Sequence, residues 1–175
     1  AFASGFMLMG MSLLYGYSGS LLIDQLALAI PYQVASPALL LTGAALMMVG
    51  LLFKIGAAPF HAWTPDVYQG APTPVTGFMA AGVKAAAFLA MLRFFSTVVV
   101  QVEGSFKPFL WTVAILTMMV GTFFGLVQDN IKRMLAYSSI AHAGFILIAF
   151  TKGALNANGA VLFYLLCYGI ATIGA

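Results

Sequence analysis

Long apolar stretches, separated by shorter and more polar segments, restrict the fold of this chain more than any other feature. About six of these stretches come near the length that a helix needs to cross the hydrocarbon core of a bilayer. A helix pairs every backbone group within its own segment, as a lipid environment requires. The sequence therefore predicts an all-α fold, a polytopic transmembrane helix bundle forming one domain. The expected spans are residues 1–17, 38–63, 75–100, 109–127, 135–151 and 159–175.

Composition supports a membrane protein and excludes several other classes. Hydrophobic residues make up 63% of the chain and charged residues 6%, against about 25% charged residues in soluble domains. The basic residues are scattered, so we expect no nucleic-acid partner. Cys167 is the one cysteine, and His61 and His142 belong to different segments, so neither a disulfide nor a metal site is expected. Since no glycine-rich nucleotide motif is present either, we expect no cofactor.

The two ends of the sequence lie inside apolar stretches. Residue 1 is Ala, and no basic segment precedes the first apolar stretch, which argues against a signal peptide. We therefore expect this chain to be an internal part of a longer polytopic protein.

Positive charge near the span ends gives an orientation. The connection at 128–133 contains Lys132 and Arg133, and the positive-inside rule places it in the cytoplasm. Alternation of spans then places residues 64–74 on the same side. Three connections are expected on the opposite side, at 18–37, 101–108 and 152–158.

Lys84 is a charge in the middle of an expected span. It lies ten residues after Pro74 and nine before Arg93, which is roughly 15 Å of helix in either direction. A lysine at that depth costs about 2.5–3.5 kcal/mol on insertion scales. A proton or ion-handling role is one interpretation. The alternative is a structural ammonium capped by carbonyl groups or by a carboxylate. Arg93 itself is expected to reach the far interface.

Lys54 lies beside an expected break in the second span. Pro59 has no N–H group, so the carbonyl of Ile55 loses its helical partner, and Gly56 loosens the same turn. Non-helical backbone at this depth is tolerated where it is buried in protein or lines a watery cavity. The freed carbonyls would favour a cation nearby. The alternative is that the Lys54 side chain extends to the interface without further function.

The fifth span carries a polar face. His142 follows Ser138 by four residues and Ser139 by three, so the three side chains share one side of a helix. His142 is a candidate proton relay because its unperturbed pKa is about 6.5, and an interhelical hydrogen bond is the alternative. The pair Tyr164 and Tyr168 is interpreted as packing rather than as part of a proton pathway. His61 is interpreted as an interfacial residue, and a proton entry group is the alternative.

Several segments resemble one family. Residues 53–76, which include the run Trp-Thr-Pro-Asp-Val-Tyr, are similar to subunit N of proton-pumping NADH:quinone oxidoreductase (respiratory complex I), an antiporter-like membrane subunit. Residues 83–86, 130–144 and 1–6 resemble the same family. The resemblance implies that the spans correspond to the sixth to eleventh helices of a fourteen-helix fold with a discontinuous seventh helix.

The resemblance also implies residue roles. Lys54 matches the lysine of the discontinuous helix, and Lys84 matches the bridging lysine of the next helix. Two further family residues, a glutamate and a lysine, would lie before and after this sequence. Protons would pass from Lys54 through bound water to Lys84, with His142 in the relay. The implied partners are the lipid bilayer and other membrane subunits of complex I, and the implied location is a bacterial inner membrane rather than an organelle. The redox chemistry would occur in other subunits.

Two other functions stay open from the sequence. One is a subunit of a cation/proton antiporter or of an ion-pumping membrane hydrogenase, because these share the broken helix. The other is a passive membrane scaffold in which both lysines are structural.

Overall fold

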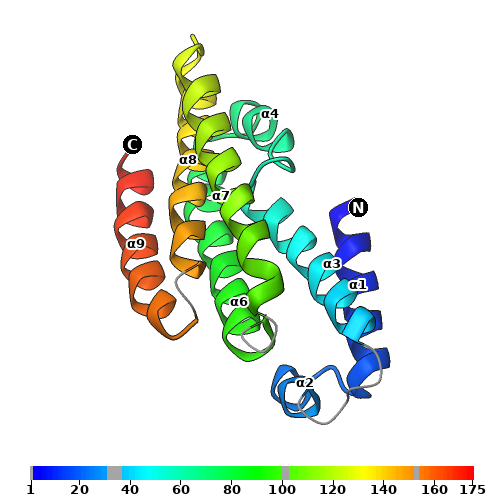
Figure 1. Cartoon of the computed structure of the whole chain (residues 1–175). Coiled ribbons are helices and arrows are strands. Elements are labelled where there is room, and N and C mark those ends of the chain that lie inside the picture. Colours follow the sequence, from blue (N-terminus) through cyan, green and yellow to red (C-terminus); the bar gives the residue numbers. More distant parts are fainter. Residues whose placement is uncertain (1, 31–36, 100–102, 152–153) are drawn as a thin grey trace.

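The structure is a computed structural model that describes residues 2–30, 37–99, 103–151 and 154–175 (Figure 1). These parts are helical and contain no strand, so the predicted all-α fold is confirmed for them. The helices are α1 Phe2–Ser18, α2 Ile23–Ala29, α3 Pro37–Ile55, α4 Trp63–Gly70, α5 Thr73–Phe78, the π-helix η1 Met79–Val83, α6 Lys84–Thr97, α7 Glu103–Leu126, α8 Ile131–Phe150 and α9 Ala154–Gly174.

Four segments are long and apolar enough to cross a membrane: Ala38–Ile55, Thr73–Thr97, Phe106–Leu126 and Ile131–Phe150. The second of these runs through α5, η1 and α6 without interruption. The α1 and α2 helices would add a fifth span if they are taken as one segment with a bend of 49°. The apolar part of α9, Asn158–Gly174, is shorter.

Glycine allows two helix pairs to approach closely. A Cβ atom on Gly10 of α1 would lie 2.7 Å from the backbone nitrogen of Met47 in α3. A Cβ atom on Gly144 of α8 would lie 2.9 Å from the backbone nitrogen of Met118 in α7. Small residues at such crossings allow dense packing in lipid, where the hydrophobic effect does not drive helices together.

The polar connections gather at the two ends of the bundle. At one end the Arg133 Nη1 atom lies 2.6 Å from the Asp66 carboxylate, and Lys132 donates to the Ala71 carbonyl at 3.2 Å. The connections 64–74 and 128–133 therefore lie together, as span alternation predicts. The α2 helix lies at the opposite end (Figure 1), where Arg93 reaches Asp24 at 3.5 Å.

Several expected connections are partly helical. The α7 helix begins at Glu103 and contains Pro108, although 101–108 is expected to be a loop. Pro108 is the sixth residue of α7. Because it lies so near the start of the helix, its missing N–H and its ring disturb only the first turns. Likewise α9 begins at Ala154 rather than near residue 159, and α2 lies within the expected connection 18–37. Residues 31–36, 101–102 and 152–153 of these connections lie outside the described part of the chain.

Candidate functional site

The first element of the site is the end of α3. Gly56 has a positive φ of 73°, which glycine adopts without a steric penalty. Its N–H donates to Phe53 at 3.1 Å, and the N–H of Ala57 donates to Leu52 at 2.9 Å. These two bonds form a Schellman motif, which satisfies carbonyls at the end of a helix. The helix therefore ends at Ile55, where the sequence places the break, and Gly56 ends it before Pro59 is reached.

The turn after Gly56 is held by neighbouring elements. The peptide bond between Ala58 and Pro59 is cis. The Ala58 N–H donates at 3.0 Å to the Thr117 hydroxyl of α7, which is fully buried and itself donates to the Val113 carbonyl at 2.6 Å. Across the turn, the Trp63 Nε1–H donates to the Phe53 carbonyl at 3.0 Å. The two helical parts on either side of the break are thereby fixed to each other.

Lys54 occupies the last turn of α3 and is exposed. It borders a cavity of about 420 Å³ between α1, α3 and α6, whose other lining residues are apolar except for Arg93. No carboxylate lines this cavity within the described residues. This exposure agrees with both interpretations of Lys54, as a relay residue and as an interfacial side chain.

Lys84 is buried, with 2% of its surface exposed. Its Nζ donates to the Ser139 carbonyl at 2.9 Å and to the Ser139 hydroxyl at 2.7 Å. That hydroxyl in turn donates to the Ala136 carbonyl at 2.9 Å. The Nζ also lies 5.9 Å from the centre of the Tyr68 ring. Among the described residues, Lys84 thus meets a carbonyl, a hydroxyl and an aromatic face, and no carboxylate.

A π-helix directly precedes Lys84. The η1 segment Met79–Val83 has the wider π spacing, and α6 begins at Lys84 itself. Single π turns inside helices occur often at functional sites. Apart from Gly82, the sequence offers no signal for this element.

His142 forms an interhelical hydrogen bond. Its Nδ1 lies 2.7 Å from the Tyr164 hydroxyl of α9, and its ring centre lies 5.1 Å from that of Tyr168. The Tyr164 ring packs with its centre 6.0 Å from that of His142, in agreement with the interpretation as packing, and its hydroxyl is in addition the hydrogen-bond partner of His142. The Tyr168 hydroxyl is buried and has no partner at hydrogen-bonding geometry among the described residues, although Thr172 and Ser139 are polar neighbours.

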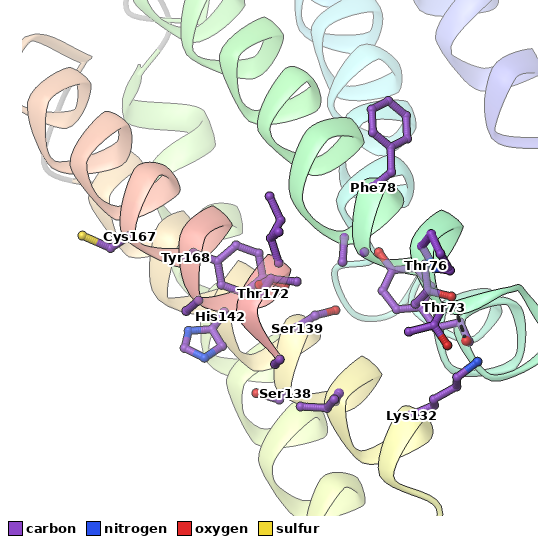
Figure 2. Close-up of a pocket in the computed structure, with 18 of the residues that line it drawn as sticks. Thr73, Thr76, Phe78, Lys132, Ser138, Ser139, His142, Cys167, Tyr168 and Thr172 are labelled. Atoms are coloured by element: carbon purple, nitrogen blue, oxygen red, sulfur yellow. Dashed lines mark hydrogen bonds between the residues drawn. The ribbon is translucent and has the colours of Figure 1, made fainter.

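These side chains border one cavity of about 830 Å³ between α5, η1, α8 and α9. Figure 2 shows Ser138, Ser139 and His142 beside Tyr168 and Thr172 of the neighbouring helix. Since Ser139 holds Lys84, the cavity reaches the partner of the buried lysine. The predicted polar face of 138–142 is therefore brought to Lys84, whereas Lys54 borders the other cavity.

Three residues of this site were not predicted from the sequence. Tyr68 faces Lys84, Thr117 holds the turn at Ala58, and Trp63 joins the two sides of the break. Aromatic residues are frequent in the short segment that contains Trp63 and Tyr68, and this could have indicated aromatic packing beside the break. No signal near Thr117 indicates its partner, which lies 59 residues earlier in the chain. The described residues contain no cluster of metal-ligating side chains.

A membrane helix bundle with an interrupted helix, followed by a helix that carries a buried lysine, defines the class of antiporter-like membrane subunits. The family model for the transmembrane part of NADH:quinone oxidoreductase and Mrp antiporters matches residues 1–175. The chain belongs to this family.

Individual relatives agree with this assignment. The chain is 54% identical to NADH-quinone oxidoreductase subunit N of Beutenbergia cavernae, covering all of this chain and 33% of that protein. It is 52% identical to subunit N of Trichlorobacter lovleyi, covering 36% of that protein. The chain therefore spans about a third of the length of these curated relatives.

Solved structures agree with the fold. A chain of respiratory complex I from Thermus thermophilus matches with a TM-score of 0.76 and 41% identity, over 98% of this chain and 36% of that one. A chain of the Mrp complex from Dietzia sp. DQ12-45-1b matches with a TM-score of 0.87 over 98% of this chain and 31% of that one. At 23% identity, the second match shows the fold alone.

Proposed function

We propose that this chain is part of a proton-translocating membrane subunit of an NADH:quinone oxidoreductase. The relatives that match the whole chain carry the name of subunit N of that complex. The observation within the structure that carries the proposal is the buried Lys84 Nζ, held at 2.7 Å by the hydroxyl of Ser139. A buried lysine without a carboxylate partner can exist in either protonation state, because no fixed negative charge retains its proton.

Lys84, Lys54 and His142 are the proposed relay residues. Ser139, which holds Lys84, and His142 border the same cavity. Lys54 lies at the interrupted end of α3, where bound water would be needed to pass a proton to Lys84. Moving one charge against about 100 mV requires roughly 2.3 kcal/mol. Quinone reduction in other subunits would supply this energy, and this chain would need no cofactor of its own.

The proposed membrane location and partner subunits follow from the similarity to subunit N. The chain would work in the inner membrane of a bacterium, beside other antiporter-like membrane subunits of the complex. Its exposed apolar side chains, such as Phe123 at 62% and Phe163 at 70% exposure, would face lipid or those subunits.

Replacing Lys84 with Met in the complete complex tests the proposed function. We expect proton translocation driven by NADH to fall severalfold per assembled complex, because methionine fills similar space but cannot carry a proton. Assembly is checked by purification of the intact complex, and translocation is measured in proteoliposomes. Unchanged translocation and unchanged quinone reduction in an assembled Lys84→Met complex would favour the passive scaffold instead. Isolation of the wild-type protein without any redox subunit would favour a stand-alone antiporter.

A further inference from the structure

Three aromatic side chains connect the end of α3 with Lys84. The Phe53 ring stacks on Trp63 with centres 5.6 Å apart and planes inclined by 18°. Trp63 meets Tyr68 edge to face, with centres 6.4 Å apart. The Tyr68 ring lies 5.9 Å from the Lys84 Nζ. The series therefore begins at the residue next to Lys54 and ends at the buried amine of Lys84.

The Tyr68 ring has a fixed position. It is 2% exposed and packs with Ala80 and Ala136 in a small apolar cluster that also includes Trp63. Its own backbone carbonyl accepts a hydrogen bond from the Thr76 hydroxyl at 3.1 Å. A ring held on several sides in this way keeps its face towards Lys84.

The two contacts of Lys84 with Ser139 can hold either protonation state of the amine, and they are stronger for the charged form because its hydrogen bonds are charge-assisted. A charged lysine has three N–H donors, and a neutral amine has two. Ser139 offers two acceptors, its carbonyl and its hydroxyl, so it satisfies both donors of the neutral form and two of the charged form. The face of an aromatic ring also attracts the cation through its quadrupole. Tyr68 is therefore the described contact that faces the charged amine once Ser139 has accepted two of its three donors.

We propose that Tyr68 is a positioning residue for proton transfer at Lys84. Its ring holds the ammonium against Ser139, and Trp63 and Phe53 fix that ring relative to the break beside Lys54. The inference rests on the proposed function, since it assigns Tyr68 a role only if Lys84 carries protons. It predicts that loss of the aromatic ring lowers proton transfer more than loss of the hydroxyl group, which is a polar neighbour of Ser139.

The test compares variants of the complete complex in proteoliposomes, with NADH-driven proton translocation measured per assembled complex. We expect Tyr68→Leu to lower the rate about fivefold or more, since a desolvated cation–ring contact is lost. We expect Tyr68→Phe, which keeps the ring, to stay within about twofold of the wild type. If Tyr68→Leu fails to assemble, Tyr68→Met provides the same loss of the ring with a more adaptable side chain.

Tyr137→Leu is the matched control. Tyr137 is also a buried tyrosine, and it stacks on Phe124 at 6.0 Å rather than facing Lys84. We expect the rate of this variant to stay within about twofold of the wild type, so that a similar loss in Tyr137→Leu and Tyr68→Leu would indicate general packing damage. Equal losses in Tyr68→Phe and Tyr68→Leu, or no loss in the latter, would also overturn the inference.

The Lys84→Met variant distinguishes a wrong role for Tyr68 from a wrong proposed function. If Lys84→Met abolishes translocation while Tyr68→Leu does not affect it, the role of Tyr68 is wrong and the proposed function stands. If an assembled Lys84→Met complex translocates protons normally, the proposed function itself is wrong.

Discussion

Thr117 contacts the interrupted segment through one oxygen that both donates and accepts. It accepts the Ala58 N–H at 3.0 Å and donates to Val113 in its own helix at 2.6 Å. The Ala58 N–H lies after the end of α3, where helical bonding no longer provides an acceptor. A buried backbone donor without an acceptor costs about 1–3 kcal/mol.

Thr117→Val is therefore expected to destabilise the protein by about 1–3 kcal/mol, because valine has a similar shape but no acceptor. Thr117→Ser keeps the hydroxyl and should recover most of this loss. The measurement is the midpoint of thermal unfolding of the detergent-purified protein. Thr112→Val is the control, because the Thr112 hydroxyl is exposed and donates to Pro108 of its own helix. A Thr117→Val midpoint equal to that of Thr112→Val would argue against the role of this bond.

At the scale of elements, α7 and α8 depend on close backbone approach. A Cβ atom on Gly144 would lie 2.6 Å from the Met118 side chain, 2.9 Å from the Met118 nitrogen and 3.1 Å from the Ala114 carbonyl oxygen. Two of these three atoms are backbone and cannot turn aside. Any side chain at this position must push the helices apart.

Gly144→Ala should consequently destabilise the helix pair by about 1–3 kcal/mol through overpacking, even though alanine is the better helix former. Gly159→Ala in α9 is the matched control, since nothing lies within 4 Å of its added Cβ atom. That control should be neutral or slightly stabilising. Resistance of the purified variants to thermal unfolding compares the two changes. A Gly144→Ala variant as stable as Gly159→Ala would show that α7 and α8 can separate freely.

The elements also show how far the sequence could predict this site. Depth along the apolar stretch predicted the burial of Lys84, and Gly56 with Pro59 predicted the interruption of the helix. Both predictions use only neighbours along the chain. The partners Tyr68, Ser139 and Thr117 come from other helices, and their contacts depend on crossing angles that local patterns do not determine. The hydrogen bond between Tyr164 and His142 was not predicted for the same reason, because the two residues lie on different helices.

At the scale of the whole molecule, the polar connections divide between two ends. The Asp66 and Arg133 side chains join two connections at one end, and Asp24 and Arg93 meet at the other. Both ion pairs include an exposed partner, so they contribute little to stability. They nevertheless show which connections lie at the same end of the bundle. The positive-inside rule, applied to Lys132 and Arg133, predicts that the first end is cytoplasmic.

Single cysteines introduced into the full-length protein, with Cys167 replaced by Ala, test this arrangement. We expect Asp129→Cys and Pro72→Cys to react with a membrane-impermeant maleimide only when the cytoplasmic face is accessible, as in inverted vesicles. Gln25→Cys in α2 should react only from the opposite face. All three positions are exposed. Reaction of Asp129→Cys and Gln25→Cys from the same face would contradict the arrangement.

The hydrogen bonds at the end of α3 also bear on the order in which segments fold during synthesis and membrane insertion. The bonds of Gly56 and Ala57 close onto residues three and five positions earlier, so they form as soon as this segment leaves the ribosome. The acceptor of Ala58 lies 59 residues later, which at ordinary rates of synthesis is roughly 3–12 s of translation. Until α7 arrives, the Ala58 N–H has no protein acceptor at Thr117, and burying it in lipid would be costly. We therefore expect the interrupted segment to complete its insertion together with α7, so that α3 to α7 integrate into the membrane as one unit.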